Sequence, residues 1–287
     1  MSAVFKRELS SYFNNVSGYV FGAFLLLFAG IYCTAYNLQG AYASFEYTLG
    51  NMPITFLIIV PVLTMRSMAE EKHARTDQLL YALPVSLTSV VMAKYLAMVT
   101  VLGIPVGVMC FYPLILGQYG KVGFASAYGS ILAFFLLGCA LIAIGMFISS
   151  LTESQVIAAV VSVGVLLLTY LMSGLAGLLP ETAGASYAGF LVAAILVGLI
   201  VQVMVKNSTV SMGVTAVLVV ILSALYFFKQ DLFAGALPDL LESLALFDRM
   251  YSFTNGIFDL TAVVYYLTVA ALFVYLTVQS MDKKRWS

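Results

Sequence analysis

Eight stretches of the chain contain no Asp, Glu, Lys or Arg, and each is at least 19 residues long. A helix needs about 20 mostly apolar residues to cross the hydrocarbon core of a bilayer. The stretches are continuously apolar and lack the alternating pattern of a lipid-facing β-barrel, which favours helices. The sequence therefore predicts an all-α, polytopic membrane protein with about eight transmembrane helices. We expect these near residues 18–39, 51–67, 91–117, 125–150, 155–179, 187–205, 208–228 and 261–281.

The scarcity of charge excludes a soluble protein. Only 9% of the residues are charged and 62% are apolar, whereas a soluble domain carries about 25% charged residues. The apolar content also excludes a disordered chain. The net charge is zero, so nothing indicates a nucleic-acid partner.

The basic residues predict the orientation. With the N-terminus in the cytoplasm, the inner segments carry ten of the thirteen Lys and Arg residues, as the positive-inside rule requires. Eight spans return the C-terminus to the cytoplasm. Residues 1–13 place their apolar side chains on one helical face, which predicts an amphipathic helix in the membrane interface. The alternative is a disordered basic terminus that only anchors the topology.

The polar residues exclude several function classes. The spans have no ionisable residue within their cores, which argues against a proton-coupled carrier, although a passive channel remains compatible. The single His73 and the scattered Cys33, Cys110 and Cys139 form no metal-ligand pattern. No P-loop, HExxH or GxSxG motif occurs. We therefore expect no catalytic, metal or cofactor site in this chain, and any ATP would be hydrolysed by a separate subunit.

The segment 66–94 holds the densest charge cluster. Six of the twelve residues 66–77 are charged, and Glu71 and Arg75 have the i,i+4 spacing that supports a helix. Leucines at 79, 80 and 83 add an apolar edge, and Pro84 ends the run. A polar helix of this kind fits the groove of a soluble partner. A solvated loop that carries topology charges is the alternative.

This segment resembles the permeases of type-2 ABC transporters. The residues that carry the resemblance are Met65-Arg66-Ser-Met-Ala-Glu70-Glu71-Lys72, Thr76-Asp-Gln-Leu79-Leu80, Leu83-Pro84-Val85-Ser86 and Lys94-Tyr-Leu. A second block near the end contains Tyr251-Ser-Phe253, Gly256-Ile-Phe-Asp259 and Lys283-Lys284-Arg285-Trp286. The pattern is similar to the branch of gliding-motility and nitrous-oxide-reductase-maturation permeases. Arg75, Gln78 and Ala93 depart from it, where that branch usually has Gly, Glu and Gly.

The resemblance implies a coupling helix at about residues 68–83, seated in a cleft of an ABC ATPase subunit. It implies coupling roles for Met68, Glu70, Glu71, Lys72, Arg75, Thr76, Leu79, Leu80, Leu83 and Pro84. A smaller cytoplasmic contact is expected at Thr152, Glu153 and Ser154. Two permease copies, identical or paralogous, and two ATPase subunits holding ATP and Mg would complete a transporter in the lipid of a prokaryotic cytoplasmic membrane.

The span count departs from the six spans common in such permeases. Two extra spans are expected at 187–205 and 208–228, although re-entrant helices within 178–190 are an alternative. In the segment 229–259 a short helix is expected to open at Pro238, capping the exit or docking an extracytoplasmic partner, unless this segment is a solvated loop. We expect one transmembrane domain, 1–287, built from 1–13, spans in 18–67, the coupling segment 68–90, spans in 91–179 and 187–228, the outer segment 229–259 and a last span 261–281.

The leading hypothesis is the permease subunit of an ATP-driven transporter of unidentified substrate. A membrane scaffold or sensor coupled to an ABC ATPase is the second hypothesis. A passive channel is the third.

Overall fold

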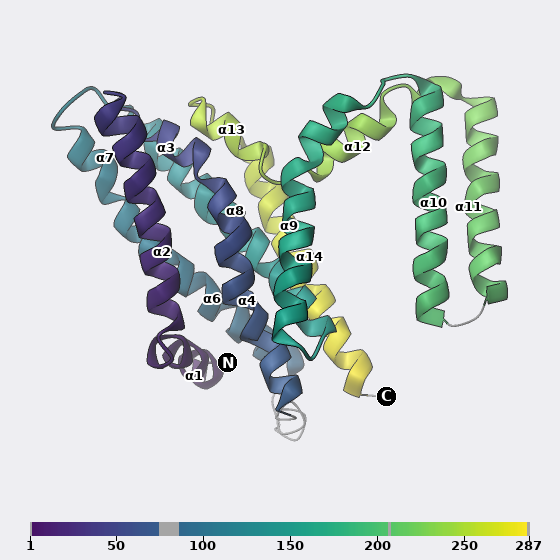
Figure 1. The fold of residues 1–287 in the computed structure, drawn as a ribbon, viewed down its shortest axis with the longest axis horizontal. Helices are drawn as coiled ribbons and strands as arrows, with labels where there is room; N and C mark the ends of the chain where they lie inside the picture. Colours follow the sequence, from purple (N-terminus) through teal and green to yellow (C-terminus); the bar gives the residue numbers. More distant parts are fainter. Residues whose placement is uncertain (1, 75–85, 206–207, 286–287) are drawn as a thin grey trace. The chain divides into compact units, whose positions relative to one another are not determined.

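The computed structural model describes residues 2–74, 86–205 and 208–285, and these residues form helices joined by turns and loops (Figure 1). The chain divides into two compact units, one made of Met1–Leu168 and Leu246–Ser287, the other of Thr169–Ala245. The helices of the first unit are α1 (Ser2–Asn14), α2 (Ser17–Tyr32), the π-helix η1 (Cys33–Gln39), α3 (Glu46–Asn51), the 3-10 helix η2 (Pro53–Thr55), α4 (Phe56–His73), α6 (Leu87–Met109), α7 (Phe111–Leu116), α8 (Phe124–Leu151), α13 (Arg249–Thr254) and α14 (Leu260–Arg285). The helix α9 (Gln155–Leu178) begins in the first unit and ends in the second, which also holds α10 (Ala183–Val205), α11 (Ser208–Phe228), the 3-10 helix η3 (Gln230–Phe233) and α12 (Ala236–Leu244).

The helix α8 forms the core of the first unit. It packs against α14, α4, α6 and α13, and most of its length is buried. Glycines let its neighbours approach closely. A Cβ on Gly138 would lie 3.1 Å from the Phe56 ring, and one on Gly145 would lie 2.9 Å from Cβ of Thr64. Small residues at helix contacts allow this packing in a membrane, where apolar burial alone brings no helices together.

A sharp bend separates α1 from α2, which point in different directions in Figure 1. The residue at the bend, Val16, has φ 61°, in the left-handed region. A β-branched residue is strained there. At the bend, a Cβ on Gly18 would lie 3.1 Å from the Tyr12 carbonyl oxygen, so a larger residue would press on α1. The helix expected over residues 1–13 is therefore present as α1, which packs on α6 and α2. Its place in the membrane interface stays a prediction.

The polar side chain of Asn37, in the π-helix η1, organises the loop between η1 and α3. Its amide nitrogen donates to the carbonyl oxygens of Tyr42 (2.7 Å) and Ser44 (3.0 Å). Its amide oxygen accepts from the Thr48 hydroxyl at 2.6 Å. A buried amide with these partners is satisfied without a ligand.

Six helical segments of the described residues are long and apolar enough to cross a membrane, so the chain is a multi-pass membrane protein. They are Ser17–Gln39, Glu46–His73, Leu87–Leu116, Phe124–Leu151, Gln155–Leu178 and Leu260–Lys283. Each matches one expected span. The helical segments extend beyond the expected spans, most clearly in the second, which is Glu46–His73 against 51–67, and in the third, which begins at Leu87 against 91. The other two stretches, 187–205 and 208–228, form α10 and α11, and the total of eight spans and their orientation stay predictions.

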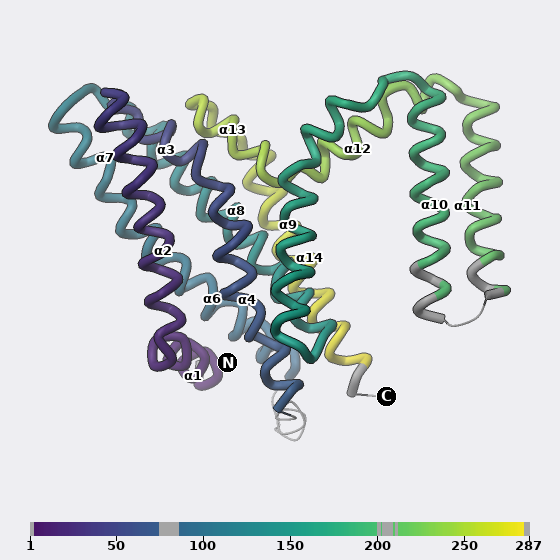
Figure 2. Tube along the Cα trace, viewed as in Figure 1, coloured from purple at the N-terminus to yellow at the C-terminus, as the bar shows by residue number. Residues whose placement is uncertain are grey.

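The second unit contains the helices α10 and α11, which lie side by side (Figure 2). Aromatic rings join their ends: Tyr187 stacks on Tyr226 with centroids 4.5 Å apart, and Phe233 of η3 meets both edge-on. The chain bends by 117° between α11 and the segment Gln230–Leu244. The helix expected to open at Pro238 begins two residues earlier, after Gly235, whose φ of 75° glycine adopts without strain.

Substitution of Gly145 by Ala should loosen the contact between α8 and α4. The new methyl group would overlap the stiff, buried Thr64 side chain, and overpacking of this kind costs about 1–3 kcal/mol. The measurement is the thermal unfolding temperature of the purified protein in detergent. Gly164 of α9 is the matched control, because a methyl group there meets nothing within 4 Å. Equal melting of G145A and G164A would contradict the close approach of α8 and α4.

Candidate functional site

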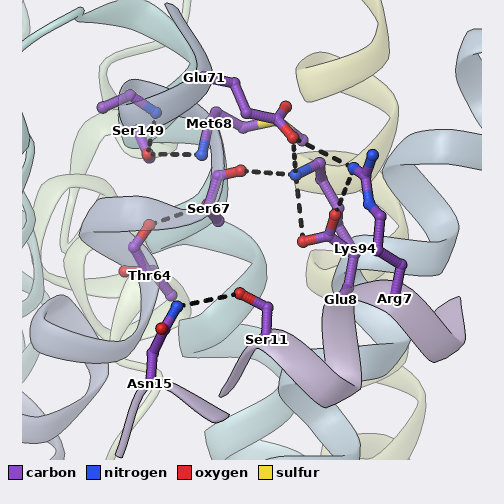
Figure 3. Close-up of polar contacts among 11 residues, drawn as sticks. Arg7, Glu8, Ser11, Asn15, Thr64, Ser67, Met68, Glu71, Lys94 and Ser149 are labelled. Carbon is purple, nitrogen blue, oxygen red and sulfur yellow. Dashed lines mark hydrogen bonds and ion pairs between the residues drawn. The ribbon is translucent and has the colours of Figure 1, made fainter. Parts of the chain in front are cut away.

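Four charged side chains from three helices meet at one end of the first unit (Figure 3). They are Arg7 and Glu8 of α1, Glu71 of α4 and Lys94 of α6, and we call them the charge cluster. The Lys94 ammonium lies 2.8 Å from Oε1 of Glu71 and 3.3 Å from Oε2 of Glu8. The Arg7 guanidinium lies 2.8 Å from Oε1 of Glu8 and 3.5 Å from Oε1 of Glu71. Two carboxylates thus bridge two cations and join three helices.

The burial of Lys94 explains why this cluster needs two carboxylates. Its side chain is 3% exposed, and an unpaired ammonium is very costly to bury. Its nitrogen also donates to the Ser67 carbonyl oxygen at 3.0 Å. The ammonium thus donates to Ser67 and Glu71 of α4 and forms an ion pair with Glu8 of α1. Lys94 keeps all of these partners only while α1 and α4 are both in place around α6.

The carboxylates also affect their neighbours electrostatically. The hydrogen bond to Glu8 raises the pKa of Arg7 above its ordinary value, and the charge of Glu71 adds to this. Burial raises the pKa of the Tyr12 hydroxyl, and the negative charges of Glu8, Glu70 and Glu71 raise it further. The Tyr12 side chain therefore stays neutral beside the charge cluster.

A second set of polar contacts ties the end of α4 to the end of α8. The Ser149 hydroxyl accepts from the backbone N–H groups of Met68 (3.2 Å) and Ala69 (3.1 Å) and donates to the Met65 carbonyl oxygen (3.1 Å). The buried Lys72 ammonium donates to the Ser150 carbonyl oxygen. The Ser149 hydroxyl thus contacts three backbone groups of α4, which couples the position of α4 to α8.

Four of the expected coupling residues lie in the part of the chain that the structure describes, and they differ in burial: Met68, Glu70, Glu71 and Lys72. Met68 is 1% exposed and Lys72 is 6% exposed, while Glu71 belongs to the charge cluster. Glu70 is exposed, and its carboxylate forms no hydrogen bond or ion pair with the residues that the structure describes. Of these four, Glu70 alone presents its side chain fully for contact with another protein. The other expected coupling residues lie outside the described residues: Arg75, Thr76, Leu79, Leu80, Leu83 and Pro84.

The expected smaller contact at 152–154 forms the turn between α8 and α9. The Thr152 hydroxyl accepts from the Ser154 N–H at 3.2 Å, and the Ser154 hydroxyl accepts from the Ile157 N–H at 3.4 Å, as a helix N-cap does. Glu153 is exposed between them. Contact of this turn with a partner stays a prediction.

Sequence reasoning missed Arg7, Glu8, Lys94, Ser149 and Ser150 as members of the site. It treated the charged residues as topology signals and the serines as ordinary residues of a span. One signal was available, because Lys94 is the only charged residue between 78 and 120 and falls within an expected span. An isolated charge there needs a partner.

The described residues contain no group of three or more His, Cys, Asp or Glu side chains placed to hold a metal ion. Among the cysteines, Cys33 and Cys139 are buried, and Cys110 donates to the Val106 carbonyl oxygen at 3.5 Å.

A family model described as ABC-2 family transporter protein matches residues 4–188. The chain belongs to this family. All four members of the charge cluster, together with Ser149 and Ser150, fall inside the matched range, so they lie in the family's own part of this ABC-2 permease. No curated protein and no solved structure matched the chain.

Replacement of Lys94 by Met should destabilise this ABC-2 permease. Removal of one partner from a buried ionic cluster leaves the others uncompensated and costs about 3–5 kcal/mol, and here it leaves two carboxylates at 14% and 19% exposure. The readouts are the melting temperature and the rate of proteolysis within α1. Lys6→Met is the matched control, because Lys6 is exposed on the same helix as Glu8 and outside the cluster. Unchanged melting of K94M would show that the cluster does not hold the helices together.

Proposed function

We propose that this chain is the permease subunit of an ATP-driven ABC-2 transporter. It moves an unidentified substrate across the cytoplasmic membrane of a prokaryote, using ATP hydrolysed by a separate ABC ATPase subunit. The family membership and the six apolar helices support this proposal. Two permease copies and two ATPase subunits complete the machine. The likeness of the motifs to gliding-motility and nitrous-oxide-reductase-maturation permeases suggests the branch.

The proposal places the ATPase against the end of α4. This helix extends without a break from the apolar span to His73. Glu70 on its last turns is exposed, while Met68 and Lys72 face inward. The outward residues contact the ATPase in the proposed complex, and the inward ones fix α4 to the permease.

The observation that carries the proposal is the attachment of this end to three other helices. The charge cluster joins α4 to α1 and α6, and Ser149 with Ser150 joins it to α8. A displacement of the α4 end therefore breaks ionic contacts unless α1, α6 and α8 follow. In this way, closure of an ATPase dimer moves the membrane helices.

Charge reversal of Glu70 should release the ATPase subunit while leaving the permease folded. Glu70→Lys changes an exposed group with no partner among the described residues, so melting should stay close to that of the wild type. The measurement is co-purification of the ATPase with a tagged permease. Asp239→Lys is the matched control. Asp239 is exposed on α12, and its segment, 229–259, is expected on the extracytoplasmic side of the membrane. Retention of the ATPase by E70K would contradict the proposed contact.

Glu71→Lys provides an informative contrast. It brings a third cation to Lys94 and Arg7, so it should lower the melting temperature of the isolated permease before any partner is added. Loss of the ATPase in E71K alone would therefore report damage to the permease rather than a lost contact.

Reconstitution of the complex distinguishes the competing functions. ATP-dependent accumulation of a candidate substrate in sealed vesicles supports the transporter. ATP turnover with no movement of any substrate offered favours the scaffold or sensor, and ion conductance by the permease alone in a planar bilayer favours the channel.

A further inference from the structure

A groove of about 220 Å³ lies where the α1–α2 bend meets α4. It is lined by Tyr12 and Asn15 on the α1 side, by Val16 and Val20 of the bend and α2, and by Leu63 and Arg66 of α4. The proposed ATPase contact does not use it, because Glu70 is not among its lining residues.

One end of the groove suits a phosphate. The Arg66 side chain is exposed, and within the described part of the chain no hydrogen bond or ion pair engages it. Arg66 is also one of the residues that line the groove. A guanidinium binds a phosphate through two parallel N–H groups, so this end of the groove favours an anion.

The rest of the groove is apolar and leads toward the membrane. Phe21 and Leu63 form its buried wall, each 4% exposed. Val20 and Val62 are exposed at its rim, on the helices α2 and α4, which belong to two of the spanning segments. An acyl chain that enters between these helices therefore meets a continuous apolar surface.

The charges around Tyr12 limit the ligand further. The carboxylates of Glu8, Glu70 and Glu71 all act on its hydroxyl. Glu8 and Glu71 are paired with Arg7 and Lys94, so Glu70 is the carboxylate that would repel a polyanion such as a nucleotide, whereas a single phosphodiester carries one charge and can remain at the Arg66 end.

We infer that this groove binds one glycerophospholipid of the inner leaflet, with its phosphate on Arg66 and one acyl chain along Val20, Phe21 and Leu63. The bound lipid fills the space under the α1–α2 bend and holds α1 against α4. Recognition is directed at the phosphodiester rather than at the net charge of the headgroup, because Arg66 is the one cation among the described residues that line the groove.

Native mass spectrometry of the full-length permease in mild detergent tests the inference. No ATPase is present, so the outcome is independent of the proposed transport function. Phosphatidylglycerol and phosphatidylethanolamine should each give one retained lipid per chain. Diacylglycerol, which lacks the phosphate, should bind at least about tenfold more weakly, as the loss of one charged hydrogen bond predicts. Inorganic phosphate alone, titrated by calorimetry, should give no detectable binding, since it lacks the acyl chain.

Two variants separate the phosphate end from the acyl wall. Arg66→Gln should weaken retention of both phospholipids at least about tenfold. Val20→Trp should block the apolar rim and also abolish retention, with little effect on folding because Val20 is 57% exposed. Lys6→Gln removes an exposed charge from α1 outside the groove and should retain lipid as the wild type does. Melting temperatures confirm that each variant is folded.

Three results would overturn the inference. Equal lipid retention by R66Q and the wild type would remove the arginine from the site. Binding of inorganic phosphate alone would make this a phosphate site, and retention of diacylglycerol equal to that of phosphatidylglycerol would make it an apolar groove without headgroup recognition.

Discussion

The fold of the first unit depends on how the buried ammonium of Lys94 is satisfied. A cation that is 3% exposed requires partners nearby, and these come from two helices: Glu8 of α1, and Glu71 with the Ser67 carbonyl of α4. Charged hydrogen bonds in a low-dielectric setting are strong and geometrically demanding. They restrict the positions of α1, α4 and α6 much more tightly than apolar contacts do, since lipid solvates apolar side chains as well as other helices do.

The contacts of α8 extend the same constraint through the unit. Gly138 and Gly145 bring α4 and α6 close to α8 along the membrane part, and Ser149 binds the α4 backbone at the end. Because Ser149 bonds to the α4 backbone at Met65, Met68 and Ala69, the last turns of α4 up to His73 are held to α8 by polar contacts, whereas the glycine contacts are apolar.

Much of the fold could be predicted because charge-free stretches mark membrane helices directly. Six of the eight expected helices meet the length and apolarity of a span, and the helix over residues 1–13 is present. The candidate functional site was harder to predict from the sequence. The sequence located the charged segment after residue 66, but it could not show that Glu71 and Lys72 face inward while Glu70 faces outward. That distinction depends on Lys94 and Ser150, which are 23 and 78 residues away. The sequence also could not predict the groove at Arg66. This groove requires the α1–α2 bend at Val16, and valine as a residue type gives no sign of a left-handed conformation.

The packing of α14 on α8 has a consequence for how the protein is made. About 110 residues separate the end of α8 from the start of α14. At a synthesis rate of about 5–20 residues per second, α8 waits roughly 5–20 s for this partner. During that time the side of α8 that will contact α14 faces lipid or the insertion machinery, and the second unit is synthesised in between. The core of the first unit is thus completed last, by the final helix described, so the timing of biosynthesis favours early assembly of α1, α4 and α6 around the Lys94 ammonium.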